Sequence, residues 1–243
     1  MTLLRKEGEG VTEEVRRIAT TYAERDDALA GSSKRDTANR GNQWRMTEHR
    51  ARLQEILGKR LHKPLTECRV LDLGCGYGGL LAWFHGLGVP SDNLFGVDLL
   101  PNRIQAARDA HPQFRFTDAN AEHLDFADAS FDLVATFTVF SSIIDPTMAR
   151  NVARSIRRVL KSDGAVIWYD VRYPNPWNPH LKAMTKGRIE ELFSPVAMRL
   201  ESVTVLPPLG RRLGRSTDRI YPLLAGIPIL RSHYIGVLRP RRH

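Results

Sequence analysis

The sequence predicts an α/β fold in which helices cover both faces of a mostly parallel sheet. Residues 70–79, VLDLGCGYGG, have the pattern of a short buried strand that runs into a glycine-rich turn. A second apolar run, LFGV, ends at Asp98. From there to residue 170 apolar runs alternate with segments of helical pattern, and such alternation is typical of a doubly wound parallel sheet.

The composition favours a globular domain without membrane spans. The chain has 243 residues, of which 42% are hydrophobic and 26% charged, enough for one domain of generous size. It contains no apolar run of membrane-spanning length, and its first ten residues lack the apolar core of a signal peptide. Cys68 and Cys75, its two cysteines, form no disulfide pattern, so we expect a cytoplasmic protein.

The net charge of +9 is concentrated near the C-terminus, because residues 199–243 contain nine arginines and two acids. Such a region suits nucleic acid, an acidic membrane surface, or a phosphorylated or nucleotide-linked substrate. An arginine-rich solvated surface explains it equally well, since arginine is favoured along the whole chain. No aromatic side chains interleave with the basic ones as in an RNA-binding motif, which disfavours a nucleic-acid partner.

The N-terminal residues 1–64 predict a helical cap. Apolar residues at helical spacing indicate helices at 11–23 and 46–61, and Pro64 ends the segment. The residues that carry these two patterns are Val15, Ile18 and Tyr22 in the first helix and Leu53, Ile56 and Leu57 in the second.

Residues 65–243 predict the α/β domain itself. We expect strands near 69–73, 94–98, 114–117, 132–138 and 164–170, and helices near 79–86, 101–110 and 147–160. In such sheets the ligand lies beyond the carboxyl ends of the strands. Five residues with suitable chemistry fall at those ends, namely Gly74, Asp98, Asp118, Thr138 and Asp170.

The segment after Asp170 is rich in proline and asparagine, so we expect a loop over the site rather than a regular element. A short helix should follow at 185–193, and alternating patterns predict strands at 198–206 and 233–238. About 26 residues separate these last two strands, which is long for a hairpin. We therefore expect a helical insert at about 206–231.

The glycine turn and Asp98 predict a site for a nucleoside-bearing cofactor. Glycines allow a ligand to approach the backbone, and the helix that opens at Gly79 presents free amides with partial positive charge. An acid at the position of Asp98 accepts hydrogen bonds from ribose hydroxyls. Asp72 would repel a pyrophosphate group, whereas it suits a ligand with a cationic amine or sulfonium. This disfavours an NAD-dependent oxidoreductase.

At this point the chain resembles the class I S-adenosylmethionine-dependent methyltransferases, especially the small-molecule group whose first motif is similar to VLDLGCGYGG. The order of later motifs is similar too: GVDLLPNRI, TDANAEHLDF, FDLVATFTV and RRVLKSDGAVIWYD. The C-terminal third resembles members from bacterial polysaccharide and glycoconjugate gene clusters. The resemblance implies a Rossmann-like, seven-stranded sheet with an antiparallel edge strand, and S-adenosyl-L-methionine as cofactor.

The resemblance also implies roles for individual residues. Asp98 would hold the ribose, and Asp72 with the turn would hold the methionine-like tail. Thr138 would line the sulfonium side. The remaining cofactor-binding candidates are Gly74, Cys75 and Gly76 in the turn, and Leu99, Asp118 and Ala119 around the adenine.

A hydroxyl acceptor requires a group that removes its proton. Asp170 and His180 are the candidates, although Asp170 would also suit a loop-capping role and His180 a plain surface position. Asp145 has the pattern of a helix cap. No ligand spacing demands a metal, so we expect none. In the cap, candidates for the acceptor pocket are Tyr22, Arg40, Trp44 and Arg45.

We expect a methyltransferase that acts on a small-molecule acceptor, with a hydroxyl of a sugar or glycoconjugate as the leading hypothesis. A lipid, quinone or other natural-product acceptor is the alternative, which an apolar insert at 220–230 lining the pocket would favour. A nucleic-acid methyltransferase is less favoured, because FTVFSSI stands where amino-group nucleic-acid methyltransferases carry N/D-P-P-Y/F. The sequence leaves the oligomeric state open.

Overall fold

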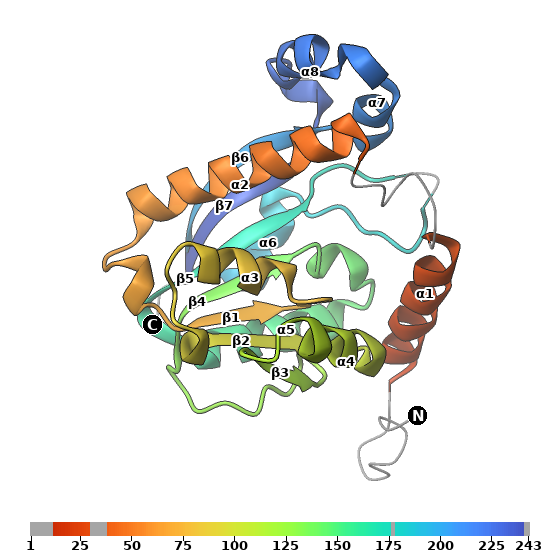
Figure 1. The fold of residues 1–243 in the computed structure, drawn as a ribbon. Helices are drawn as coiled ribbons and strands as arrows, with labels where there is room; N and C mark the ends of the chain where they lie inside the picture. The colour runs from red at the N-terminus through yellow and green to blue at the C-terminus, as the bar shows by residue number, and fades with distance from the viewer. Residues whose placement is uncertain (1–11, 30–37, 176–177, 241–243) are drawn as a thin grey trace.

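The computed structural model describes residues 12–29, 38–175 and 178–240, and it contains one seven-stranded sheet (Figure 1). The strand order is β3-β2-β1-β4-β5-β7-β6, and β7 alone runs antiparallel to its neighbours. The predicted fold class is therefore confirmed. The strands are β1 (Val70–Leu73), β2 (Leu94–Asp98), β3 (Arg115–Asp118), β4 (Phe131–Phe137), β5 (Leu160–Val171), β6 (Val196–Val205) and β7 (Arg231–Pro240).

Helices cover both faces of this sheet. Residues of α2, α3 and α4 share one buried cluster with one face, and residues of α1, α5 and α6 share a second cluster with the other. The helices are α1 (Glu13–Leu29), α2 (Arg40–Arg60), α3 (Gly79–Gly86), α4 (Pro101–Ala110), α5 (Pro146–Val159), α6 (Lys186–Phe193), α7 (Pro207–Arg212) and α8 (Thr217–Ala225).

Local signals position these elements. Asp145 caps α5, since its side chain accepts a hydrogen bond from the backbone N–H of Met148 at 2.5 Å. Pro101 and Pro146 occupy first-turn positions of α4 and α5, where a missing N–H costs nothing. The predicted first helix begins at Glu13, and residue 11 lies outside the described residues.

Strand β5 starts at Leu160, directly after α5, whereas the prediction placed its start near residue 164. The partners of β4 on β5 jump from Leu160 to Ala165, so residues 161–164 bulge out of the ladder. Residues 161–164, at the junction of the predicted helix and the predicted strand, thus form a bulge within a longer strand. Such a bulge is invisible to a pattern of apolar residues, since its exposed Ser162 and Asp163 look like a turn.

The connections after β1, β2 and β4 leave the sheet at one edge, because those strands are parallel. The loop after β5, 172–185, leaves at the same edge and contains no helix or strand among its described residues. Helix α1 lies beside this edge (Figure 1). Within the described part of the chain, no helix has the length and apolar character to span a membrane.

Candidate functional site

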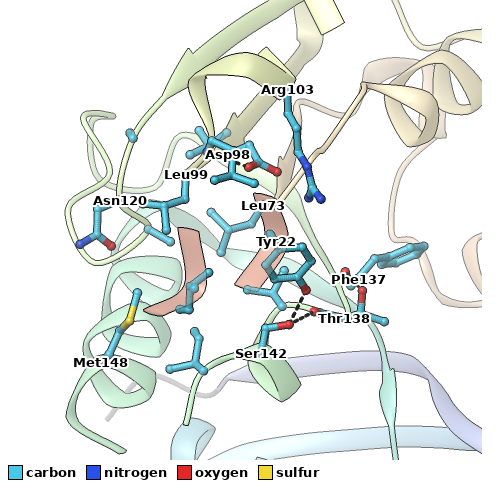
Figure 2. A pocket seen from close by; sticks show the side chains of 18 residues that line it. Tyr22, Leu73, Asp98, Leu99, Arg103, Asn120, Phe137, Thr138, Ser142 and Met148 are labelled. Atoms are coloured by element: carbon cyan, nitrogen blue, oxygen red, sulfur yellow. Dashed lines mark hydrogen bonds between the residues drawn. The ribbon is translucent and has the colours of Figure 1, made fainter. Parts of the chain in front are cut away.

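A pocket opens at the carboxyl edge of the sheet, between the ends of β1, β2 and β4 and the covering helix α1 (Figure 2). Most of its wall is apolar, with a carboxylate, a guanidinium and three hydroxyl groups on it. This is the composition of a site for a flat, partly polar organic molecule. The side chains that dominate the wall are Ile18, Tyr22, Asp98, Leu99, Arg103, Ala119, Asn120, Phe137, Thr138, Val139, Ser142, Ile143 and Met148.

The glycine turn is fixed against β2. The backbone N–H groups of Gly74 and Cys75 both donate to the carbonyl of Val97, at 2.7 and 3.0 Å. Gly74 and Gly76 have φ values of 75° and 54°, in the left-handed region that favours glycine. A Cβ atom on Gly76 would meet no atom within 4 Å, so the turn presents bare backbone to open space.

Asp98, an acid of the pocket wall, is held by two backbone N–H groups. Its Oδ2 accepts the N–H of Gly76 at 2.9 Å, and its Oδ1 accepts the N–H of Leu100 at 3.0 Å. These bonds hold the carboxylate at the wall of the pocket. Because each carboxylate oxygen offers two acceptor positions, both oxygens can still accept a hydroxyl donor from a ligand.

Asp72 lies behind the turn, is 2% exposed and does not belong to the pocket wall. Burial, and then the charge of Asp98, raise its pKa to about 8. None of the hydrogen bonds found among the described residues involves its carboxylate. A cation placed near it would therefore favour its charged form.

The structure places the other predicted cofactor residues unequally. Leu99, Ala119 and Thr138 line the pocket, as do Gly74 and Asp98. Cys75 is buried, and its sulfur faces Gly96 of β2. Asp118 is half-buried beside Ala119, with one oxygen 3.8 Å from Nη2 of Arg108, and it lies outside the pocket wall.

Thr138 adopts an unusual backbone conformation at the pocket. Its φ of 57° lies in the left-handed region, which is costly for a β-branched residue. Its N–H donates to the carbonyl of Tyr169 at 2.7 Å, and its carbonyl accepts the hydroxyl of Ser142 at 3.0 Å. This left-handed conformation lies where the chain leaves β4 and enters the turn at 140–142.

Helix α1 is tied across the pocket at both ends. Near its start, Glu14 accepts the N–H of Ile144 at 2.6 Å, and Arg17 donates to the carbonyl of Ser142 at 2.6 Å. Arg17 and these backbone N–H groups hold the pKa of Glu14 below its usual range. In the middle, the hydroxyls of Tyr22 and Ser142 are 2.5 Å apart (Figure 2).

The far end of α1 is held by an ion pair. Arg103 of α4 donates from Nε and from Nη2 to the carboxylate of Asp26, at 2.8 Å each, and the hydroxyl of Tyr77 lies 3.3 Å from the same carboxylate. The guanidinium also lies 4.7 Å from the centre of the Tyr22 ring. Sequence patterns missed Arg103 and Asp26, because their partnership joins positions 77 residues apart.

The two candidate bases differ in position. Asp170, at the end of β5, is 1% exposed, and its oxygens accept the N–H groups of Ser141 at 3.0 Å and Val171 at 2.8 Å. Burial raises its pKa to about 6. His180 is exposed in the loop after β5, and neither residue belongs to the pocket wall.

Of the four candidates in the cap for an acceptor pocket, Tyr22 alone lines this pocket. Arg40 and Trp44 instead bind Asp218 of α8, at 2.8 Å each. Arg45 has a buried Nε without a hydrogen-bond partner among the described residues. Within those same residues, no group of three histidine, cysteine or acidic side chains is arranged to hold a metal ion.

Comparison with known families matches residues 70–164 to a methyltransferase domain. An uncharacterized methyltransferase of Synechocystis is 29% identical over 109 residues, covering 45% of this chain and 50% of the relative. A demethylmenaquinone methyltransferase of Chlorobaculum parvum is 29% identical over 143 residues, covering 59% and 54%. The chain thus spans about half the length of these curated relatives.

Solved structures share the fold over most of the chain. A geranyl diphosphate C-methyltransferase from Streptomyces coelicolor has a TM-score of 0.68 at 14% identity, covering 96% of this chain and 100% of that one. A protein from Pyrococcus horikoshii has a TM-score of 0.61 at 20% identity, covering 88% and 99%. At these identities the likeness establishes the fold alone.

Proposed function

We propose that this chain, which belongs to the class I S-adenosylmethionine-dependent methyltransferases, transfers a methyl group from S-adenosyl-L-methionine to a small-molecule acceptor. The observation that carries the proposal is the position of Asp98. Two backbone N–H groups hold its carboxylate at the wall of an apolar pocket, next to a bare glycine turn.

The residues in and around the pocket suit this cofactor part by part. Asp98 would accept both ribose hydroxyls, and the apolar side chains of Leu99, Ala119 and Met148 would enclose the adenine ring. The backbone of Gly76 leaves room for the methionine-like tail. Asp72, a buried carboxylate with a raised pKa, would pair with the tail's ammonium group.

When bound, the cofactor supplies a methyl group on a positively charged sulfur, which an acceptor atom attacks in line. The protein's contribution is chiefly to bring donor and acceptor together and to exclude water. Helix α1, tied to residues 142–145 and to Arg103, would close the pocket over the reacting groups. A hydroxyl acceptor would also have to lose its proton.

For that proton we propose Asp170 rather than His180. Its carboxylate lies at the end of β5 and reaches the turn that carries Ser142, a residue of the pocket wall. A carboxylate with a pKa of about 6 is charged at neutral pH and still basic enough to take a proton. His180 is exposed on the loop and is the weaker candidate.

We propose a hydroxyl of a sugar or glycoconjugate as the acceptor. The hydroxyl groups of Tyr22, Thr138 and Ser142, which gather on one wall of the pocket, support this, because they can bind the hydroxyls of such a ligand (Figure 2).

The second candidate is a lipid, quinone or other natural-product acceptor. It is supported by the apolar wall of Ile18, Phe137 and Ile143 and by the names of relatives. These include a demethylmenaquinone methyltransferase, a sterol 4-C-methyltransferase of Caenorhabditis elegans and a phthiotriol/phenolphthiotriol dimycocerosates methyltransferase of Mycobacterium ulcerans.

Calorimetric titration with S-adenosylmethionine, S-adenosylhomocysteine and NAD tests the cofactor site. We expect micromolar binding of the two adenosyl compounds and none of NAD; binding of NAD alone would overturn the proposal. Transfer of a labelled methyl group to a panel of nucleotide-linked sugars, oligosaccharides and quinols then separates the two acceptor classes.

A further inference from the structure

The segment between β6 and β7 forms a separate projection at the edge of the molecule that carries the pocket. Strands β5 and β6 both run antiparallel to β7, so they are parallel to each other. Therefore β6 ends at the carboxyl edge, where the pocket opens. Helices α7 and α8 follow there, and in Figure 1 they stand above the sheet, near the start of α2. We call residues 207–230 the insert.

The inner face of the insert is packed against α2. Tyr221 is 1% exposed, its ring stacks on Trp44 with centres 5.6 Å apart, and its hydroxyl donates to Glu48 at 2.9 Å. A Cβ atom on Gly41 would lie 2.2 Å from the carbonyl oxygen of Gly210, so α2 and α7 are in backbone contact. The insert is therefore held in a fixed orientation.

The outer face of the insert is apolar and uncovered. Six large hydrophobic side chains are exposed among the described residues, and four of them lie in the ten residues 220–229. Leu223 and Ile229 are each 71% exposed, Ile227 44% and Ile220 37%. A contiguous stretch of this kind marks an interaction surface, because isolated proteins rarely leave such side chains together in water. No residue of the insert lines the cofactor pocket, so the arrangement that would have favoured a lipid acceptor is not found there.

The insert also carries exposed arginines. Arg212, Arg215 and Arg219 are exposed, and among the described residues none of them forms an ion pair. Asp218, the insert's one acid, is already bound by Arg40 and Trp44. The insert therefore combines an apolar tip with uncompensated positive charge.

We propose that the insert docks the protein on an anionic lipid bilayer, with Leu223, Ile227 and Ile229 at the headgroup boundary and the arginines on lipid phosphates. Apolar side chains rimmed by arginine are the pattern of surface-bound membrane segments. Binding is peripheral, since no helix among the described residues could span a bilayer. The proposal does not rest on the proposed methyl transfer. Its test measures binding of the protein to vesicles, which needs no turnover.

Two other occupants fit the surface less well. A second copy related by a two-fold axis would place both sets of three arginines in one interface, and the insert's one acid, Asp218, is already bound. A single-stranded nucleic acid would need aromatic platforms for its bases, and the exposed apolar residues of the insert are leucine and isoleucine.

The arrangement has a consequence for the acceptor. The insert and the pocket share the carboxyl edge of the sheet, so docking holds that edge toward the bilayer. An acceptor that resides in the bilayer, such as a lipid-linked sugar or a quinol, would then approach the pocket along the shortest path.

Co-sedimentation of the full chain with vesicles tests the proposal. We expect binding to phosphatidylcholine vesicles that contain a third of phosphatidylglycerol, and little binding to phosphatidylcholine alone. The double variant Leu223→Ser/Ile229→Ser should weaken binding by roughly tenfold or more. Neutralising Arg212, Arg215 and Arg219 to glutamine should weaken it on the order of a hundredfold, since each arginine near an anionic surface contributes about fivefold.

The matched control is a triple change of exposed arginines on α2 and α5, at Arg60, Arg150 and Arg154, to glutamine, which alters the net charge equally. It should retain binding. Equal binding of the insert variants and this control would overturn the proposal. So would a loss of self-association on light scattering, or a loss of nucleic-acid binding in the arginine variant alone, because these outcomes identify another occupant.

Discussion

Arg103 and Asp26 form a two-bonded ion pair that joins α4 to α1 across the mouth of the pocket, with both N···O distances at 2.8 Å. Each side chain is only 12% exposed. The pair is thus shielded from water, and the same guanidinium supports the ring of Tyr22. We therefore expect helix α1 to act as a lid over the pocket and to contribute to ligand affinity.

Asp26→Asn should loosen α1. The loss of a charged, part-buried hydrogen-bonded pair is expected to cost roughly 1.5–3 kcal/mol in the free energy of unfolding and to weaken binding of S-adenosylmethionine. Asp92→Asn is the control, because its pair with Arg115 is exposed and has a distance of 3.4 Å. It should cost less than about 1 kcal/mol. Urea unfolding measures the stability of both variants, and calorimetry measures their affinity for S-adenosylmethionine. Equal effects of the two variants would mean that α1 does not act as a lid.

Gly76→Ala should weaken cofactor binding out of proportion to its effect on stability. A left-handed φ costs a residue with a Cβ roughly 1–2 kcal/mol, and at Gly76 that Cβ would enter the space assigned to the ligand. Gly214→Ala is a close control, because Gly214 has φ of 53° and equally open surroundings but lies in the insert. Both variants should unfold at similar urea concentrations, and only Gly76→Ala should bind S-adenosylhomocysteine poorly.

Asp98→Asn should reduce affinity for adenosyl ligands on the order of a hundredfold. The charged acceptor of two ribose hydroxyls is lost, and each such bond contributes roughly 1.5–3 kcal/mol. Asp109→Asn on the exposed side of α4 serves as control. If calorimetry gives the same dissociation constant for both variants, the ribose lies elsewhere.

The centre of the sheet was predictable because β1, β2 and β4 are buried along nearly their whole length and therefore read as short apolar runs. Glycines at 74 and 76 and an acid at the end of a strand were predictable from local spacing. These residues could be identified because their roles depend on residues close to them in the sequence.

The lid and the insert were not predictable in the same way. Glu14 accepts a backbone N–H 130 residues away, and Asp218 pairs with Arg40, which is also far from it in the sequence. Neither contact produces a repeating pattern of apolar and polar residues from which it could be predicted. The apolar residues at 220–229 were visible in the sequence, but only the fold shows that they are exposed and do not line the pocket.

Asp170→Asn tests the proposed base. If Asp170 takes the acceptor's proton, it must be charged, so the turnover rate of the natural chain should fall as pH drops below about 6. The variant should lose tenfold or more in kcat with little change in cofactor affinity, and the acid limb of its pH profile should vanish. A fall in stability with an unchanged pH profile of kcat would mean that Asp170 only holds the turn at Ser141 in place.

Binding of the cofactor should release a proton from Asp72. Burial and Asp98 raise the pKa of Asp72 from its ordinary 3.8 to about 8, so at pH 7 the folded protein holds a proton that the unfolded chain has lost. Since the folded state binds more protons between these values, stability should fall as pH rises from about 4 to 8. An ammonium group beside Asp72 favours the charged carboxylate instead of the protonated form, so the carboxyl group loses its proton.

Calorimetry at pH 7 in buffers of different ionisation enthalpy measures the release directly. We expect close to one proton for S-adenosylmethionine and S-adenosylhomocysteine, and none for adenosine, which lacks the charged tail. Affinity for the two tailed ligands should rise with pH from 6 toward 8. Asp72→Asn should abolish the release while leaving adenosine binding intact. Equal proton release for adenosine, or none for any ligand, would mean that the tail does not lie beside Asp72.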